Sequence, residues 1–194
     1  NLSGKLSHGD PIPRNASFIG PLTRFKILPD MKKEFDVLVV LSGPEPQRTA
    51  LENIVMEQLK HDNLNTLVVR GVPEKSQRIK LSNSISVVSS LDSEALNIAM
   101  LTSDLIISRP GYSTIMDMAV LGCKAVLIPT PGQTEQEYLA GELERKKLFF
   151  VQRQENFHLL EALNQSKNYT GFARNEYDDS MLRETVRKFL NRIN

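Results

Sequence analysis

The chain has 194 residues, of which 40% are apolar and 24% charged, and its formal net charge is +1. This length and composition fit one soluble globular domain or one and a half, and the near-neutral charge argues against a general nucleic-acid-binding surface. The single cysteine, Cys123, excludes an internal disulfide framework and suits a reducing compartment. No stretch approaches the ~20 apolar residues that span a bilayer. We therefore expect a cytoplasmic protein, with membrane contact at most peripheral.

Turn-forming residues dominate the first 35 residues. Glycine and proline recur from Gly4 to Pro29 without helical or strand periodicity, and only Ser17–Ile19 has the pattern of a short strand. Residues 1–14 are alternatively a disordered N-terminus. His8 is interpreted as a solvated side chain.

The first regular unit begins with Asp36–Leu41, a largely apolar run typical of a strand buried on both faces. A turn with Ser42 and Gly43 follows, and then a helix. This is the geometry of a phosphate-binding first loop, although one glycine is not a dinucleotide fingerprint. Arg48, in the first turn of the helix, either neutralises phosphate charge or is a solvated residue.

Two more strands are predicted at Asn65–Val69 and Ile85–Val88, with a polar connection at Gln77–Asn83 between them. A helix follows, with Ser90 or Asp92 as its N-cap.

Two strand–loop–helix units then follow one another. In each, a short buried strand ends in a loop with proline and glycine, and a helix starts directly afterwards. Parallel strands end at one edge of a sheet, so both helix N-termini should lie on the rim where open α/β sheets bind ligands. Helix N-termini favour phosphate. The strands are expected at Asp104–Ile107 and Ala125–Ile128. The first helix begins at Tyr112 and ends at Leu121–Gly122, and the second begins at Gln133.

The first of these helices carries hydroxyls and an acid at a defined spacing. Gly111 allows a close approach to a ligand, and Ser113 and Thr114 offer hydroxyl and N–H groups to a diphosphate. Asp117 lies three and four residues further on, so it shares their helix face and can accept two hydrogen bonds from a ribose diol. Alternatively, Ser113 and Thr114 only cap the helix and Asp117 is a solvated acid.

The remaining elements are a strand at Phe149–Val151, a short helix at His158–Leu163, a polar loop at Asn164–Asp178 and an amphipathic helix at Ser180–Ile193. The whole pattern predicts a three-layer α/β/α Rossmann-like domain with a mostly parallel sheet of about six strands.

Residues 108–130, SRPGYSTIMDMAVLGCKAVLIPT, resemble the donor-binding segment of GT-B-fold glycosyltransferases, in particular the MurG-type enzymes of family 28. Gly111 and Asp117 keep the family's interval between glycine and acid, which the plant-type UDP-glycosyltransferases share. Thr134–Tyr138 is similar to the family's sugar-contacting run. Two positions differ: the acid is Asp117 where glutamate is usual, and Glu137 replaces the second glutamine of that run.

The resemblance implies the C-terminal half of a GT-B enzyme. Residues 1–30 would be an interdomain linker and entrance segment, and residues 31–194 a nucleotide-sugar-binding domain. A preceding N-terminal domain would contact this one, hold the acceptor and supply the general base. The implied activity is metal-independent transfer of a hexosyl or N-acetylhexosaminyl group from a UDP-sugar, which is a co-substrate, so that no cofactor is required.

The same resemblance assigns contacts to each part of the donor. The nucleotide and diphosphate are assigned to Ser42, Gly43, Arg48, Arg109, Gly111, Tyr112, Ser113, Thr114 and Asp117, the base to Ser90 and Leu91, and the sugar to Gln133, Thr134, Glu135, Gln136 and Glu137.

Two other functions remain open. A nucleotide-sugar 2-epimerase or hydrolase of this fold needs acid and base groups near the sugar, and Glu135 and Glu137 are the local candidates. A non-catalytic nucleotide-sugar-binding subunit would work with a separate membrane partner. The three histidines are far apart in sequence, so no metal site is expected.

Overall fold

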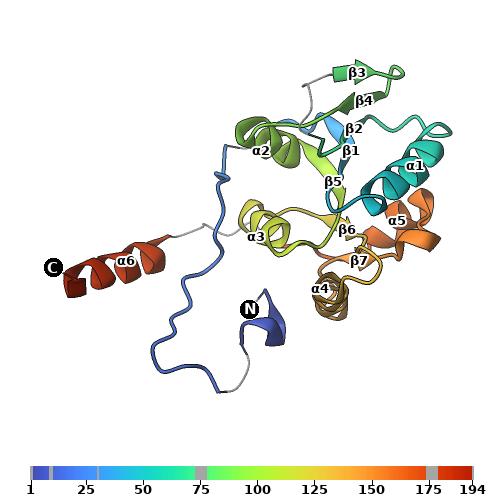
Figure 1. The fold of residues 1–194 in the computed structure, drawn as a ribbon. Coiled ribbons are helices and arrows are strands. Elements are labelled where there is room, and N and C mark those ends of the chain that lie inside the picture. The colour runs from blue at the N-terminus through green and yellow to red at the C-terminus, as the bar shows by residue number, and fades with distance from the viewer. Residues whose placement is uncertain (1, 9–10, 30, 73–77, 174–178, 194) are drawn as a thin grey trace.

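The structure is a computed structural model that describes residues 2–8, 11–29, 31–72, 78–173 and 179–193. Its body is a seven-stranded sheet in the order β3-β4-β2-β1-β5-β6-β7, with helices on both faces (Figure 1). The predicted three-layer α/β/α architecture is confirmed. The strands are β1 (Phe35–Val40), β2 (Thr66–Val69), β3 (Arg78–Lys80), β4 (Ile85–Val88), β5 (Ser103–Ser108), β6 (Ala125–Leu127) and β7 (Phe150–Val151).

The centre of the sheet is β1, which pairs in parallel with β2 on one side and β5 on the other. Val37, Leu38 and Val39 are all 0% exposed, which explains why this strand is a continuous apolar run. The chain builds outward from β1 through β2 to β4 and then returns to β5 on the opposite side. This reversal creates a switch point between the carboxyl ends of β1 and β5, where open α/β sheets bind ligands.

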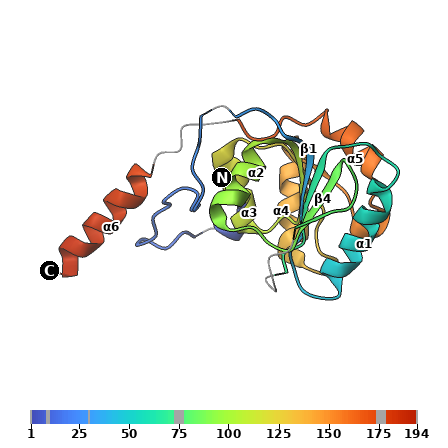
Figure 2. The ribbon, with the colours of Figure 1, turned by 90° about the horizontal axis from the view of Figure 1, so that it is seen from above.

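The helices form one layer on each face, as Figure 2 shows from above. On one face lie α2 (Ser93–Leu101), α3 (Tyr112–Leu121) and α4 (Thr134–Arg145), and on the other α1 (Gln47–Leu59) and α5 (Leu159–Ser166). Each helix buries an apolar stripe against the sheet. Two short 3-10 helices, η1 (Gly4–Leu6) and η2 (Gln154–Asn156), complete this part of the chain.

The last helix, α6 (Ser180–Ile193), projects away from the body of the domain (Figures 1 and 2). Its apolar side chains remain exposed: Phe189 is 61% exposed and Met181 51%. Within the described parts of the chain, no helix combines the length and the apolar character needed to cross a membrane.

Three predictions for irregular segments are wrong. The connection predicted at Gln77–Asn83 contains β3, an antiparallel edge strand on β4; all three of its residues are exposed, so no apolar pattern marks it. Ser17–Ile19 is not a strand, because no neighbouring strand pairs with it. The loop predicted from Asn164 begins later, because α5 continues to Ser166; residues 174–178 and Gln77 lie outside the described residues.

The segment predicted to be a linker is attached to the domain. Phe25 is 5% exposed and enters the core, and the backbone of Lys26 exchanges two hydrogen bonds with the Asn97 side chain of α2, at 2.8 and 3.1 Å. Nearer the N-terminus, the N–H of Lys5 donates to the hydroxyl of Tyr138 on α4 at 2.8 Å. His8 is only partly solvated: it is half-buried and its ring stacks on Phe18, with the ring centroids 4.0 Å apart.

Candidate functional site

The N-terminus of α3 is open to a ligand. Gly111 is its N-cap, with extended backbone, no side chain caps the helix, and its first turn contains no acid. The N–H of Ile115 makes the first helical bond, to the carbonyl of Gly111 at 3.0 Å. The N–H groups of residues 112–114 precede it and have no partner within the helix. As predicted, the helix ends at Gly122, whose φ of 69° is the left-handed conformation of a C-cap.

A cleft of about 670 Å³ lies beside this turn, at the switch point of the sheet. The carboxyl ends of β1 and β5 form its floor, and α3 and α2 each form a wall. Residues 22–25 and the start of α6 complete the lining. The structure thus gathers four of the predicted nucleotide residues, Ser42, Ser113, Thr114 and Asp117, around one cavity. The lining is Leu22, Thr23, Arg24, Phe25, Val40, Ser42, Leu96, Met100, Ile106, Ser108, Ser113, Thr114, Asp117, Asp179 and Leu182.

Asp117 is half-buried in the wall of the cleft rather than solvated. The hydroxyl of Thr23 donates to its Oδ1 at 2.5 Å. Burial raises the pKa of this carboxyl, although the hydrogen bond from Thr23 and the charge of Arg24 act in the opposite direction. A carboxylate has about four acceptor positions, so one bond from Thr23 leaves room for a ligand.

Thr23 and Arg24 are site residues that the sequence did not reveal. Arg24 is the one cationic side chain among the described residues that line the cleft. The segment carries no periodic pattern and lies 94 residues from Asp117 in the chain. Its one signal is the apolar Phe25, which anchors it in the core.

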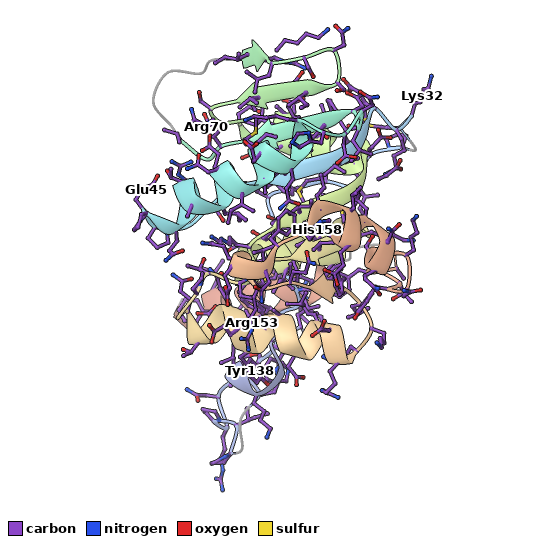
Figure 3. The ribbon with its side chains drawn as sticks, turned by 90° about the vertical axis from the view of Figure 1, so that its right-hand side faces the viewer. Lys32, Glu45, Arg70, Tyr138, Arg153 and His158 are labelled. Carbon is purple, nitrogen blue, oxygen red and sulfur yellow. The ribbon has the colours of Figure 1, made fainter. Side chains whose placement is uncertain are left out.

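The two arginines predicted to bind phosphate do not line the cleft. Arg48 is buried and forms ion pairs with Glu45 and, at 2.7 Å, with Glu52. It also donates to the carbonyl of Arg70 at 3.3 Å, and Figure 3 labels Glu45 and Arg70 near the start of α1. Two carboxylates therefore already compensate the charge of Arg48.

Arg109 is 1% exposed and joins three parts of the fold. Its guanidinium donates to the carbonyls of Ile128, Pro129 and Gln47, each at 3.0 Å, and to the side chain of Gln154. No carboxylate pairs with it among the described residues. Burial lowers its pKa to about 10, so it stays protonated at neutral pH. Arg109 thus holds the β5–α3 and β6–α4 loops to α1.

The N-terminus of α4 also lacks a side-chain cap, but it differs from that of α3 in its acidic first turn and in side chains that fold back onto the preceding loop. The side chain of Gln136 accepts from the N–H of Thr130 at 2.9 Å, and Glu137 accepts from that of Gly132 at 3.1 Å. Glu135 and Glu137 place two acids in the first turn, after the N-cap Gln133.

Of the predicted sugar residues, only Glu137 lines a described cavity, and this is a second one of about 440 Å³ between α4 and β7. That cavity also contains Arg153, labelled beside α4 in Figure 3. Thr134 and Glu135 are exposed, and Gln133 is half-buried.

The predicted base contacts, Ser90 and Leu91, lie between β4 and α2 and are half-buried, but they do not line the main cleft. Its apolar wall comes instead from Leu96 and Met100 of α2. Gly43 is exposed in the β1–α1 loop, with a φ of 105° that favours glycine. Within the described ranges, no group of three or more His, Cys, Asp or Glu side chains is arranged to hold a metal ion.

The profile of the glycosyltransferase family 28 C-terminal domain matches residues 37–188. The chain belongs to this family. The match includes the strand ends, α2 and α3 that build the cleft. It begins after Thr23 and Arg24, so these two cleft residues lie outside the part of the chain that the family profile describes.

Solved structures show the same fold. The glycosyltransferase of kitacinnamycin superposes with a TM-score of 0.63 at 16% identity over 89% of this chain and 48% of that one. MurG of Acinetobacter baumannii gives 0.53 at 22% identity, over 72% and 44%. The solution structure of ALG13 gives 0.53 at 14%, over 78% and 94%. The chain therefore spans less than half of the first two proteins. A search of curated protein sequences found no match.

A further property of this family 28 domain concerns buried polar atoms near the ends of its strands. Among the residues that the structure describes, two buried hydroxyls, Ser108 Oγ and Thr130 Oγ1, have no hydrogen-bond partner, and neither has the Nε of Arg109. Buried polar groups normally have partners. All three lie at the carboxyl ends of β5 and β6, close to the candidate site.

Proposed function

We propose that this domain binds a UDP-sugar in the cleft beside α3 and, together with an acceptor-binding domain, serves in metal-independent transfer of a hexosyl or N-acetylhexosaminyl group. One observation carries the proposal. The uncapped N-terminus of α3 and the half-buried Asp117, one and a half turns along the same helix, both face one cleft at the switch point of the sheet. This arrangement suits a ligand that joins an anionic group to a diol.

The diphosphate would lie at the first turn of α3. The N–H groups of residues 112–114 point along the helix axis, and the macrodipole adds positive potential there. Arg24 contributes a full positive charge at the rim of the same cleft. When the bond from sugar to diphosphate breaks, negative charge develops on the leaving group, and donors already in place stabilise it without reorganisation. This would make a metal ion unnecessary.

The ribose would be held by Asp117. Its carboxylate can accept hydrogen bonds from both hydroxyls of the diol, while Thr23 orients it from the other side through the bond to Oδ1. The side chain of Asp117 is shorter than that of the glutamate usual in the family. Because residues 22–25 form part of the cleft wall, they would offset this shorter reach. The base would extend toward Ser90 and Leu91, and the sugar toward Gln133–Glu137.

A second function, a nucleotide-sugar-binding subunit that works with a separate partner, is favoured by one comparison. This chain covers 94% of the solved ALG13 protein, so a domain of nearly this extent exists as a structure of its own. Both functions require the same nucleotide cleft. We further propose a reducing, cytoplasmic location, since Cys123 is buried and unpaired.

Isothermal titration calorimetry of the 194-residue chain with UDP tests the proposal. We expect UDP to bind equally well with and without EDTA, and uridine to bind more weakly because it lacks the diphosphate. We also expect the chain alone to transfer no sugar. If UDP does not bind, the assignment of the cleft as the nucleotide site is refuted. Sugar transfer by the chain alone would refute the need for an acceptor-binding domain.

A further inference from the structure

The floor of the cleft contains an unsatisfied hydroxyl. Ser108, the last residue of β5, is 2% exposed, and its Oγ has no partner among the described residues. The residue nevertheless lines the cleft, and it is in register with Val40 on β1. Ser108 therefore lies at the switch point itself, between Ser42 on one strand end and the loop that leads to α3 on the other.

Such a group destabilises the free protein, because the hydroxyl has given up its hydrogen bonds to water without gaining others. A serine side chain has three staggered χ1 positions. Because Ser108 lines the cleft, rotation about χ1 can bring its hydroxyl to a ligand without movement of the backbone. A buried group without a partner calls for an explanation, and at a ligand cleft a partner that arrives with the ligand supplies one.

Thr130 is a natural comparison. Its hydroxyl is equally buried and also lacks a partner, and it follows β6, the next strand of the sheet. However, Thr130 does not line the cleft; its Oγ1 faces Gly43, where an added Cβ would lie 3.5 Å away. The two hydroxyls share burial and the lack of a partner, and they differ in access to the cleft.

We propose that Ser108 is a binding residue for the donor and that its hydroxyl donates a hydrogen bond to an oxygen of the diphosphate. This inference rests on the proposed function of the α3 cleft. The diphosphate is the part of the donor concerned, because Ser108 directly precedes the loop that positions the N-terminus of α3. Phosphate oxygens only accept hydrogen bonds, and a hydroxyl that donates to a charged oxygen forms one of the stronger bonds in proteins.

The test compares Ser108→Ala with Thr130→Val in the 194-residue chain. Both substitutions remove an unsatisfied hydroxyl, so both should raise the thermal midpoint of the free protein by about 2–4 °C. Only Ser108→Ala should weaken UDP and inorganic pyrophosphate, by about tenfold or more, which is the usual effect of losing a hydrogen bond to a charged group. Uridine should bind Ser108→Ala and the wild type equally.

Several results would overturn the inference. Equal UDP affinity in the wild type and Ser108→Ala would show that the hydroxyl never meets the ligand. A lower midpoint for Ser108→Ala would show that it already has a partner in the free protein. An equal loss for uridine and UDP would exclude the phosphate contact. If Asp117→Ala weakens UDP and Ser108→Ala does not, only this inference fails; if the wild type binds no UDP, the proposed function fails and this inference fails with it.

Discussion

The β5–α3 and β6–α4 units have the same plan: a buried strand, a loop with proline and glycine, and a helix that begins at the carboxyl edge of the sheet. They differ in the first turn of the helix. Neither helix has a side-chain cap, and the first turn of α3 contains no acid. In α4 it has two acids, and the side chains of Gln136 and Glu137 bond to the preceding loop. Acidic side chains in the first turn offset the positive potential with which a helix N-terminus attracts an anion, so α3 suits a diphosphate better than α4 does.

The comparison depends first on Arg109, which joins the two loops. Arg109→Met should lower the free energy of unfolding by about 2–5 kcal/mol, because it leaves the carbonyls of Ile128, Pro129 and Gln47 without their donor. Urea denaturation measures this. The control is Arg145→Met on the exposed face of α4, where the loss should stay within about 0.5 kcal/mol. Equal losses would show that Arg109 does not join the loops.

The difference between the two helices should appear in nucleotide affinity. Asp117→Ala should weaken UDP by about 1.5–3 kcal/mol, the usual contribution of hydrogen bonds to a charged group. It should weaken 2′,3′-dideoxy-UDP far less, since that analogue has no diol. Glu135→Ala is the matched change on α4 and should not weaken UDP. Calorimetry with both ligands checks this, and equal losses of UDP and its dideoxy analogue in Asp117→Ala would contradict the ribose assignment.

A substitution in α4 should change the free energy of unfolding rather than the affinity for nucleotide. Gln136→Ala removes the bond to the N–H of Thr130, so the free energy of unfolding should fall by about 0.5–1.5 kcal/mol while UDP affinity stays unchanged. If the sugar extends toward α4, the same substitution changes the order in which a panel of UDP-sugars binds. A loss of affinity for UDP itself would place the diphosphate at α4 instead.

The smallest expected effect is on how the free energy of unfolding depends on pH. Burial raises the pKa of Asp117, so the folded protein binds this proton more tightly than the unfolded chain. The resulting stability is present below the ordinary aspartate pKa of about 4 and is lost as the pH rises through the folded value. The advantage of Asp117→Asn over the wild type in free energy of unfolding should therefore grow as the pH rises above about 4. A constant difference would mean that the pKa is not raised.

The sequence predicted most of the fold because apolar runs and loop residues report burial directly. The bounds of β4 and α3 were predicted to the residue, and those of β1 to within one. It missed β3, an edge strand held by backbone bonds with no buried side chain.

The candidate site was predicted less completely, because residue type and position do not specify a side chain's partners. Ser113, Thr114 and Asp117 share a helix, so their common face follows from spacing. Arg48 was predicted as a phosphate ligand from its position, but the charge match with Glu45 and Glu52 depends on three-dimensional contacts. Thr23 and Arg24 reach the cleft through tertiary packing alone.

The central claim is that the α3 N-terminus, and not that of α4, receives the diphosphate. The most direct measurement is a titration of the ¹⁵N-labelled chain with UDP, followed by the backbone amide signals. The account predicts that the amides of Tyr112, Ser113 and Thr114 shift most, while those of Thr134, Glu135 and Gln136 stay in place. Larger shifts at residues 134–136 than at residues 112–114 would contradict it.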